Sequence, residues 1–264
     1  MAAPRAVLFD IGSTLWSSPP EDPGALRYCY GRAREALLSH LPVVPPIEAL
    51  IEAVEGYFAE WEELWRVDAA RVHQPPTTRY VAEALKRDLG LEPPPEALRA
   101  FTDELLETSV HTAKTLPPEP GMAEALGELR RLGLRLGCVS NAFMGASTLH
   151  RIMEERGLGK HLELTVSSCE VGIRKPHPFI YEEAVRRLGL SNAEVIFVGD
   201  RLDADVAGPA KLGMRTVLTH QYRKEDPSDS PVRPDAVIGH LSELAGFVEG
   251  LLRREGGSAG AAGE

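Results

Sequence analysis

A carboxylate, Asp10, ends the first apolar run of this 264-residue chain. The run Ala6-Val-Leu-Phe9 leads into Asp10 and then Gly12-Ser13, which is typical of a buried strand that ends in a turn. In an open parallel sheet the ligand crevice lies beyond the carboxyl ends of the strands, so Asp10 would project a nucleophilic side chain into it. The structural alternative is a carboxylate that caps the turn or the next helix.

Three more carboxylates, Asp200, Asp203 and Asp205, fall within six residues directly after the apolar run 195–198. Mutual repulsion makes such a cluster costly unless a cation neutralises it. This second group of acidic residues therefore indicates a cation site at the end of a strand.

Two other segments place polar groups where an ordered element ends or begins. Ser140 and Asn141 follow an apolar run and offer a hydroxyl and amides that suit an anionic oxygen. Taken alone, Ser-Asn after a strand is more often a turn. Lys175 stands just before an expected helix whose first turn tolerates Pro178. A lone lysine at such a place is usually a solvated cap residue.

The elements that position these residues change character along the chain. Apolar residues at three- and four-residue steps predict helices over 26–41 and 47–64, and two more over 77–90 and 94–112. Beyond residue 121, helices and strands alternate, which predicts an α/β fold with a doubly wound parallel sheet. The expected helices are 121–132, 146–157, 178–188, 205–212 and 241–253, and the expected strands are 134–140, 164–167, 195–198, 216–218 and 236–238.

Proline-rich segments divide the chain into parts. We expect an α/β core domain of residues 1–16 and 115–255, with an all-helical insertion of residues 17–114. Residues 256–264 are rich in glycine and alanine and have too little apolar mass to order, so we expect a flexible tail.

Composition excludes several classes of partner. A net charge of −10 without a long Lys/Arg run argues against nucleic-acid and anionic-membrane surfaces. The three cysteines, Cys29, Cys138 and Cys169, are widely spaced and odd in number, which favours a reducing, cytoplasmic setting. We find no signal-peptide pattern, no membrane-spanning apolar stretch and no GxxxxGK or GxGxxG motif. The oligomeric state stays open.

The four motifs in this order, with a helical block after the first, resemble the haloacid dehalogenase (HAD) superfamily over nearly the whole chain. In that family the first motif is DxDx(T/V), the second a Ser or Thr that closes a strand, the third a Lys and the fourth GDxxxxD. The matching residues here are Asp10 with Thr14, Ser140, Lys175, and Asp200 with Asp205. The resemblance implies a Rossmann-like core with a helical cap inserted after the first strand.

The resemblance also implies a mechanism, that of a magnesium-dependent phosphatase for a small phosphorylated metabolite. Asp10 would attack phosphorus and form an aspartyl phosphate. Lys175 would offset the repulsion between the phosphate and Asp10. The residues expected to hold phosphoryl oxygens are Thr14, Ser140 and Asn141, and the expected Mg²⁺ ligands are Asp10, the Gly12 carbonyl, Asp200 and Asp205. Asp203 is either an outer group of this site or a solvated helix cap.

One position departs from the family pattern. Phosphatases of this family carry a second Asp two residues after the nucleophile, where it protonates the leaving group and later activates water, and this chain has Gly12 there. Ser13 also replaces the usual Gly. The loss of a general acid and base typically slows a reaction by about 10²- to 10⁴-fold.

Three functions fit this departure. The first is a phosphatase that is slow or that needs a good leaving group. The second is another reaction on the same scaffold, such as phosphonate cleavage, for which a cap lysine, Lys86 or Lys114, would be the nucleophile; metal-free haloacid dehalogenation is disfavoured by the acidic cluster. The third is a phospho-ligand-binding or partner module without turnover. Substrate specificity is expected to lie in the cap, where 66–74 and the tryptophans Trp61 and Trp65 are either specificity groups or ordinary loop and core.

Overall fold

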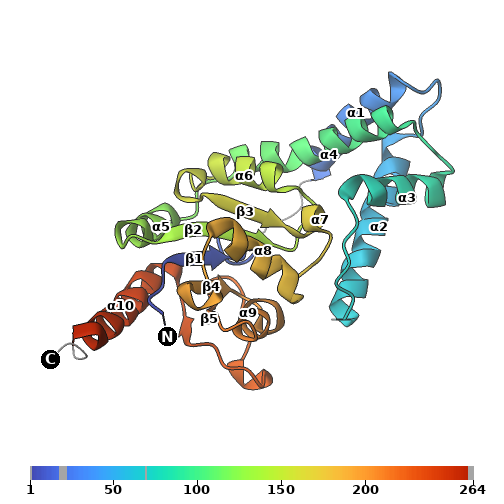
Figure 1. Cartoon of the computed structure of the whole chain (residues 1–264). Helices are drawn as coiled ribbons and strands as arrows, with labels where there is room; N and C mark the ends of the chain where they lie inside the picture. Colours follow the sequence, from blue (N-terminus) through green and yellow to red (C-terminus); the bar gives the residue numbers. More distant parts are fainter. Residues whose placement is uncertain (1, 18–22, 69, 261–264) are drawn as a thin grey trace.

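A six-stranded parallel sheet forms the centre of the molecule (Figure 1). The structure is a computed structural model that describes residues 2–17, 23–68 and 70–260. The strand order is β3-β2-β1-β4-β5-β6, with β1 in the middle. The strands are β1 (Ala6–Phe9), β2 (Arg135–Ser140), β3 (Leu164–Ser167), β4 (Val195–Gly199), β5 (Arg215–Thr219) and β6 (Ala236–Ile238). The predicted α/β fold with a doubly wound parallel sheet is confirmed.

Both faces of the sheet are covered by helices, which explains why its strands read as continuous apolar runs. On one face, Val7 and Phe9 of β1 pack with α5 (Met122–Arg131), α6 (Ala146–Glu155) and α10 (Leu244–Gly260). On the other face, Ala6 and Leu8 pack against α8 (Pro178–Leu188). Alternate residues of β1 therefore contribute to two separate cores.

Four helices lie between β1 and α5 in the chain. They are α1 (Pro23–Leu38), α2 (Ile47–Val67), α3 (Thr77–Leu89) and α4 (Pro95–Thr115). They share a hydrophobic core of their own, built around Tyr30, Leu50 and Phe101. Figure 1 shows α1 and α4 side by side, and α2 packs against α3. We call residues 23–115 the cap; residues 18–22 of its first linker lie outside the described residues.

The cap also contacts the core away from its two linkers. The segment 72–74 lies antiparallel to residues 172–174 through a bridge between His73 and Ile173. The Arg174 N–H donates to the Val72 carbonyl at 2.7 Å, and the Gln74 N–H donates to the Gly172 carbonyl at 2.9 Å. We call these paired segments the cap–core seam.

Two sequence predictions were wrong in their limits. The helix expected over 205–212 is a π-helical turn over Leu202–Ala207 followed by the short helix α9 (Gly208–Ala210), because Pro209 has no N–H to continue a regular helix. The expected tail at 256–264 begins as helix, since α10 continues to Gly260 and extending a formed helix is easier than starting one. Residues 261–264 lie outside the described part of the chain.

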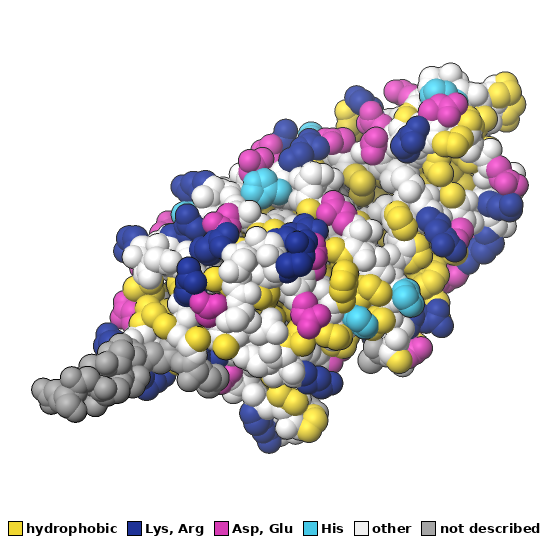
Figure 2. All heavy atoms as spheres, viewed as in Figure 1, with side chains coloured by type: hydrophobic (Ala, Val, Ile, Leu, Met, Phe, Trp, Pro, Cys, Tyr) yellow, Lys and Arg dark blue, Asp and Glu magenta, His cyan; other side chains and the backbone are white. Residues whose placement is uncertain are grey.

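Some short elements were not predicted at all. They are the helix α7 (Ser168–Val171) and single 3₁₀ turns at Gly159–His161, Asn192–Glu194, Pro227–Asp229 and Leu241–Glu243. In the described part of the chain, Cys29, Cys138 and Cys169 are free and buried, and none of the helices is long and apolar enough to cross a membrane. On the face shown in Figure 2, positive and negative side chains are interspersed.

Candidate active site

Asp10 lies at the carboxyl edge of the sheet, between the ends of β2 and β4. Its backbone N–H donates to the Val198 carbonyl at 2.9 Å, which continues the pairing of β1 with β4 by one residue. The residue is 9% exposed. A short, nearly buried carboxylate at the point where the strand order reverses is placed where open α/β sheets bind ligands.

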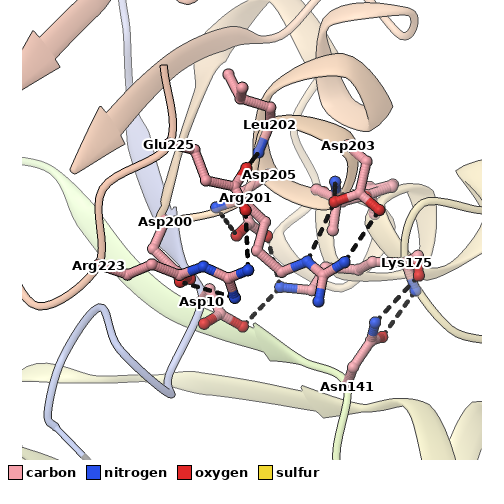
Figure 3. Close-up of polar contacts among 12 residues, drawn as sticks. Asp10, Asn141, Lys175, Asp200, Arg201, Leu202, Asp203, Asp205, Arg223 and Glu225 are labelled. Carbon is pink, nitrogen blue, oxygen red and sulfur yellow. Dashed lines mark hydrogen bonds and ion pairs between the residues drawn. The ribbon is translucent and has the colours of Figure 1, made fainter. Parts of the chain in front are cut away.

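The sheet brings Asp10 together with the other acidic strand-end residues and with Lys175 (Figure 3). Single carboxylate oxygens of Asp10, Asp200 and Asp205 lie within 4.8 Å of one another. The Lys175 Nζ donates to Asp10 Oδ1 at 2.6 Å and to Asp205 Oδ1 at 2.7 Å. The predicted residues of the first, third and fourth motifs are therefore in one cluster, which we call the acidic centre.

The acidic centre holds three carboxyl groups and one ammonium, that of Lys175. Burial, followed by the charges of Asp205 and Asp10, raises the pKa of Asp200 to about 7. Burial also raises the pKa of Asp205 to about 6, although the Lys175 ammonium opposes the shift. The pKa of Lys175 is raised, because its two carboxylate partners outweigh the burial that disfavours its charge.

A hard divalent cation fits this donor set. Its three carboxylates have oxygens within 4.8 Å of one another and can all serve as oxygen ligands. Their negative charges repel one another, and a cation would offset this repulsion. Lys175 compensates only one of the negative charges. The residues are therefore chemically compatible with a divalent cation, and the expected Mg²⁺ site stays a prediction.

Close packing at the end of β4 fixes Asp205. A Cβ on Gly199 would lie 2.3 Å from the Asp205 Cγ, so only glycine leaves room for this carboxylate. The Arg201 N–H donates to Asp205 Oδ2 at 3.1 Å. The wide π-helical turn that follows carries Asp205 back toward the acidic centre, in keeping with the frequent use of π turns at functional sites.

The turn after Asp10 contains the unusual residues of the first motif. Gly12 does not have a positive φ, and no atom lies within 4 Å of where its Cβ would be. Ser13 has φ 55°, in the left-handed region that favours glycine. Thr14 is fully buried, and its hydroxyl has no hydrogen-bond partner among the described residues. A buried hydroxyl without a protein partner suits a ligand oxygen.

Ser140 and Asn141 lie at the end of β2, at the same edge as Asp10. Ser140 is 6% exposed. The Asn141 side chain donates to the Lys175 carbonyl at 3.0 Å and accepts from the Lys175 N–H at 2.8 Å (Figure 3). Its side-chain amide therefore holds the Lys175 backbone, and the expected contact of an Asn141 amide with a phosphoryl oxygen stays a prediction.

Asp203 lies outside the acidic centre. Its carboxylate pairs with the Arg201 guanidinium at 3.1 and 3.2 Å and accepts from the Ala204 N–H at 2.8 Å. On the other side of the centre, Arg223 lies 3.9 Å from Asp200 and 3.0 Å from Glu225. No sequence pattern marked Arg223, because it is brought to the site by the loop after β5.

A cleft of about 870 Å³ opens between α2 of the cap and the acidic centre, which it reaches at Asn141 and Lys175. Trp65 and Arg66 line it from the cap, as does Arg71. Trp61 is half-buried and packs with Tyr80 and Trp65 within the cap. The cap lysines Lys86 and Lys114 do not line the cleft; they pair with Glu92 and Glu155 elsewhere.

The sequence did not indicate the contacts of Arg174, which lines the cleft, or of the buried Gln74 beside it. The Arg174 guanidinium carbon lies 3.6 Å from the centre of the Trp65 ring. Gln74 is 1% exposed and accepts hydrogen bonds from the Arg174 Nη1 at 2.8 Å and from the Ser168 hydroxyl at 2.5 Å. Only the folded cap–core seam brings these residues together.

Comparison with known proteins agrees with the fold and the motifs. Residues 4–213 match the sequence model of a family described as "Hydrolase: haloacid dehalogenase-like hydrolase". The chain is 30% identical to a glyceraldehyde 3-phosphate phosphatase of Methanopyrus kandleri, over 94% of this chain and 99% of that one. It is 33% identical to a phosphoserine phosphatase of Thermus thermophilus, over 91% and 90%. A crystal structure of a 2-haloacid dehalogenase from Pseudomonas syringae superposes with a TM-score of 0.61 at 24% identity, over 95% and 99%.

Proposed function

Because the chain belongs to the haloacid dehalogenase-like hydrolase family, we propose that it is a magnesium-dependent phosphatase for a small phosphorylated metabolite. The observation that carries this proposal is the acidic centre, where Asp10 contacts Lys175 and stands within 4.8 Å of two further carboxylates. Two relatives that share most of their length with this chain are named as phosphatases. The same fold is shared with dehalogenases, so the site and these relatives decide between the two reactions.

Asp10 is the nucleophile of the proposed reaction. Its free carboxylate oxygen attacks phosphorus, the bond from phosphorus to the leaving oxygen breaks, and an aspartyl phosphate forms. Water then attacks the phosphorus of this intermediate and releases inorganic phosphate, which regenerates Asp10. Lys175 lowers the repulsion between Asp10 and the incoming phosphate, because its ammonium is held 2.6 Å from the Asp10 carboxylate.

Phosphoryl oxygens are bound by groups that surround Asp10. Thr14 supplies a buried hydroxyl that lacks a protein partner, and Ser140 supplies another at the neighbouring strand end. The Asn141 side chain contributes indirectly, because its two hydrogen bonds hold the backbone of Lys175.

The residues that would hold Mg²⁺ are Asp10, Asp200, Asp205 and the backbone carbonyl of Gly12. When bound, the cation supplies positive charge for the phosphoryl oxygens and neutralises the carboxylates. The raised pKa values of Asp200 and Asp205 support this assignment, since burial and mutual repulsion raise them and a cation would offset both effects.

Gly12 makes the proposed enzyme slow. It has no side chain to protonate the leaving group or to activate water, so substrates with good leaving groups are favoured and the aspartyl phosphate persists. The same feature supports the second candidate function, a phospho-ligand-binding module that has lost turnover. Phosphonate cleavage has less support, because neither Lys86 nor Lys114 lines the cleft.

Hydrolysis of p-nitrophenyl phosphate, with and without Mg²⁺, tests the proposal. We expect turnover that requires Mg²⁺ and that is lost in Asp10→Asn, because an amide keeps the shape but not the nucleophile. Calorimetric titration of Asp200→Ala, which removes one carboxylate from the acidic centre, should show weakened Mg²⁺ binding.

Activity without Mg²⁺, or turnover retained in Asp10→Asn, would contradict the phosphatase mechanism. Tight binding of inorganic phosphate without any turnover would instead favour the binding module.

A further inference from the structure

Arg174 differs from the other positive side chains of the cleft in having no acidic partner. Four of them lie within 4.0 Å of a carboxylate: Arg66, Arg71, Lys175 and Arg201. In the part of the chain that the structure describes, no carboxylate comes this close to the Arg174 guanidinium. Glu62 of α2 is the acidic group that acts on it most, from beyond ion-pair distance.

The surroundings of Arg174 hold its guanidinium in place. One side lies on the Trp65 ring, with 3.6 Å between the guanidinium carbon and the ring centre. The Nη1 donates to Gln74 Oε1 at 2.8 Å, and Gln74 is in turn fixed by hydrogen bonds to Ser168 and to the Ala142 carbonyl. Arginine has five N–H donors, so most of its hydrogen-bonding capacity remains unused.

Leaving such a group uncompensated has a cost. Burial lowers the pKa of Arg174 to about 10, and the nearby Arg201 adds to the effect, whereas Glu62 opposes it. A half-buried, prepositioned guanidinium without a counter-charge is a binding group for an anion that the protein itself does not supply.

We propose that Arg174 binds a second anionic group of the substrate, a carboxylate or a second phosphate, while the first phosphate is held at the acidic centre. This inference rests on the proposed phosphatase function and narrows its substrate class. Arg174 and Lys175 are consecutive and line the same cleft, so one small molecule reaches both. A planar guanidinium suits either anion, because both accept two parallel hydrogen bonds. Arg174 is thus a specificity residue.

Matched substrate pairs test this assignment in the full-length protein. O-phosphoserine is compared with O-phosphoethanolamine, which lacks the carboxylate, and propanediol bisphosphate with propyl phosphate, which lacks the second phosphate. We expect the doubly anionic member to have the higher kcat/KM in one of the two pairs, the pair whose second anion matches that of the natural substrate. Arg174→Gln should lower kcat/KM for that doubly anionic substrate by about 10- to 100-fold, the range for a lost charge-assisted hydrogen bond. It should change kcat/KM for the singly anionic substrate of the same pair by less than about threefold.

Two further variants serve as controls. Arg66→Gln removes another cleft arginine, but one already paired with Glu63, and should preserve the discrimination. Arg174→Lys keeps the charge without the planar fork and should give intermediate discrimination. If Arg174→Gln melts at a much lower temperature than the parent, Arg174→Lys is used in its place, because it keeps the positive charge.

The inference is overturned if the parent enzyme discriminates in neither pair, or if Arg174→Gln slows both members of each pair equally. A parent protein that does not hydrolyse p-nitrophenyl phosphate would instead refute the phosphatase function. In that case, calorimetric binding of the same pairs to parent and Arg174→Gln still decides whether Arg174 recognises the second anion.

Discussion

A carboxylate at position 12 should make the proposed phosphatase faster. The position has room, because nothing lies within 4 Å of where the Cβ would be and the residue does not have a positive φ. Gly12→Asp therefore adds a side chain without the backbone strain that would arise at a left-handed position. The expected gain in the rate of dephosphorylation is about 10²- to 10⁴-fold, the usual contribution of a general acid or base.

The new charge has a cost in the absence of metal. A fourth carboxylate close to Asp10 and Asp200 is repelled by each with an energy on the order of 1–3 kcal/mol at an effective dielectric constant near 20. Metal-free Gly12→Asp should thus have a lower melting temperature than the parent, and Mg²⁺ should raise it more than it raises that of the parent.

Rapid-quench kinetics with p-nitrophenyl phosphate measure the effect. The parent should give a burst of p-nitrophenol, as the aspartyl phosphate forms, and then slow turnover; Gly12→Asp should speed the slow phase. Gly12→Asn is the matched control, since it adds the same volume without a titratable group. A stable Gly12→Asp protein that binds Mg²⁺ and phosphate but hydrolyses no faster than Gly12→Asn would refute this reasoning and favour the binding module.

Three other predictions concern the acidic centre and its turn. Between about pH 4 and 7 the folded protein binds more protons than the unfolded chain at Asp200, so the stability of the metal-free protein should fall as pH rises through this range. Asp200→Asn should remove much of that loss, on the order of 2–4 kcal/mol, as judged by denaturant melts at both ends of the range; a parent without pH dependence would contradict it. Ser13→Gly should raise stability by about 0.5–1 kcal/mol in the same assay, because φ is 55° there, and an unchanged midpoint would mean that the turn is unstrained. Gly199→Ala should weaken Mg²⁺ binding at least about tenfold in calorimetry, since the added methyl displaces Asp205, and wild-type affinity would show that Asp205 is no ligand.

Much of the sheet could be predicted from the sequence, because its strands are short apolar runs buried on both faces. β3, β6 and α8 have the predicted bounds. The meeting of Asp10 with Asp200 also followed from local patterns, since parallel strands present their carboxyl ends at one edge of the sheet. These features depend on periodicity and on a general rule of topology.

Other features depend on contacts between distant segments. The π-helical turn at Leu202–Ala207 has the composition of an ordinary helix start, and its geometry depends on the packing of Asp205 against Gly199. That no carboxylate of the described residues pairs with Arg174 depends on how α2 and its acidic residues lie across the cleft. No spacing in the sequence marks the pairing of Gln74 with Ser168, because the two residues come from the cap and the core.

The position of β1 in the sheet affects how the chain is made. β1 leaves the ribosome before the other five strands, yet Leu8 pairs with Gly137 on one side and Phe197 on the other, so both partners emerge after the whole cap. The cap helices are continuous in sequence and share their own core, and such local contacts form quickly, whereas the central strand waits for distant ones. During synthesis the apolar segment Ala6–Phe9 therefore has no neighbouring strand until β2 is translated, and it lacks the second one until β4 follows. A nascent chain halted between the cap and β2 would carry a folded helical unit and an unpaired, aggregation-prone strand.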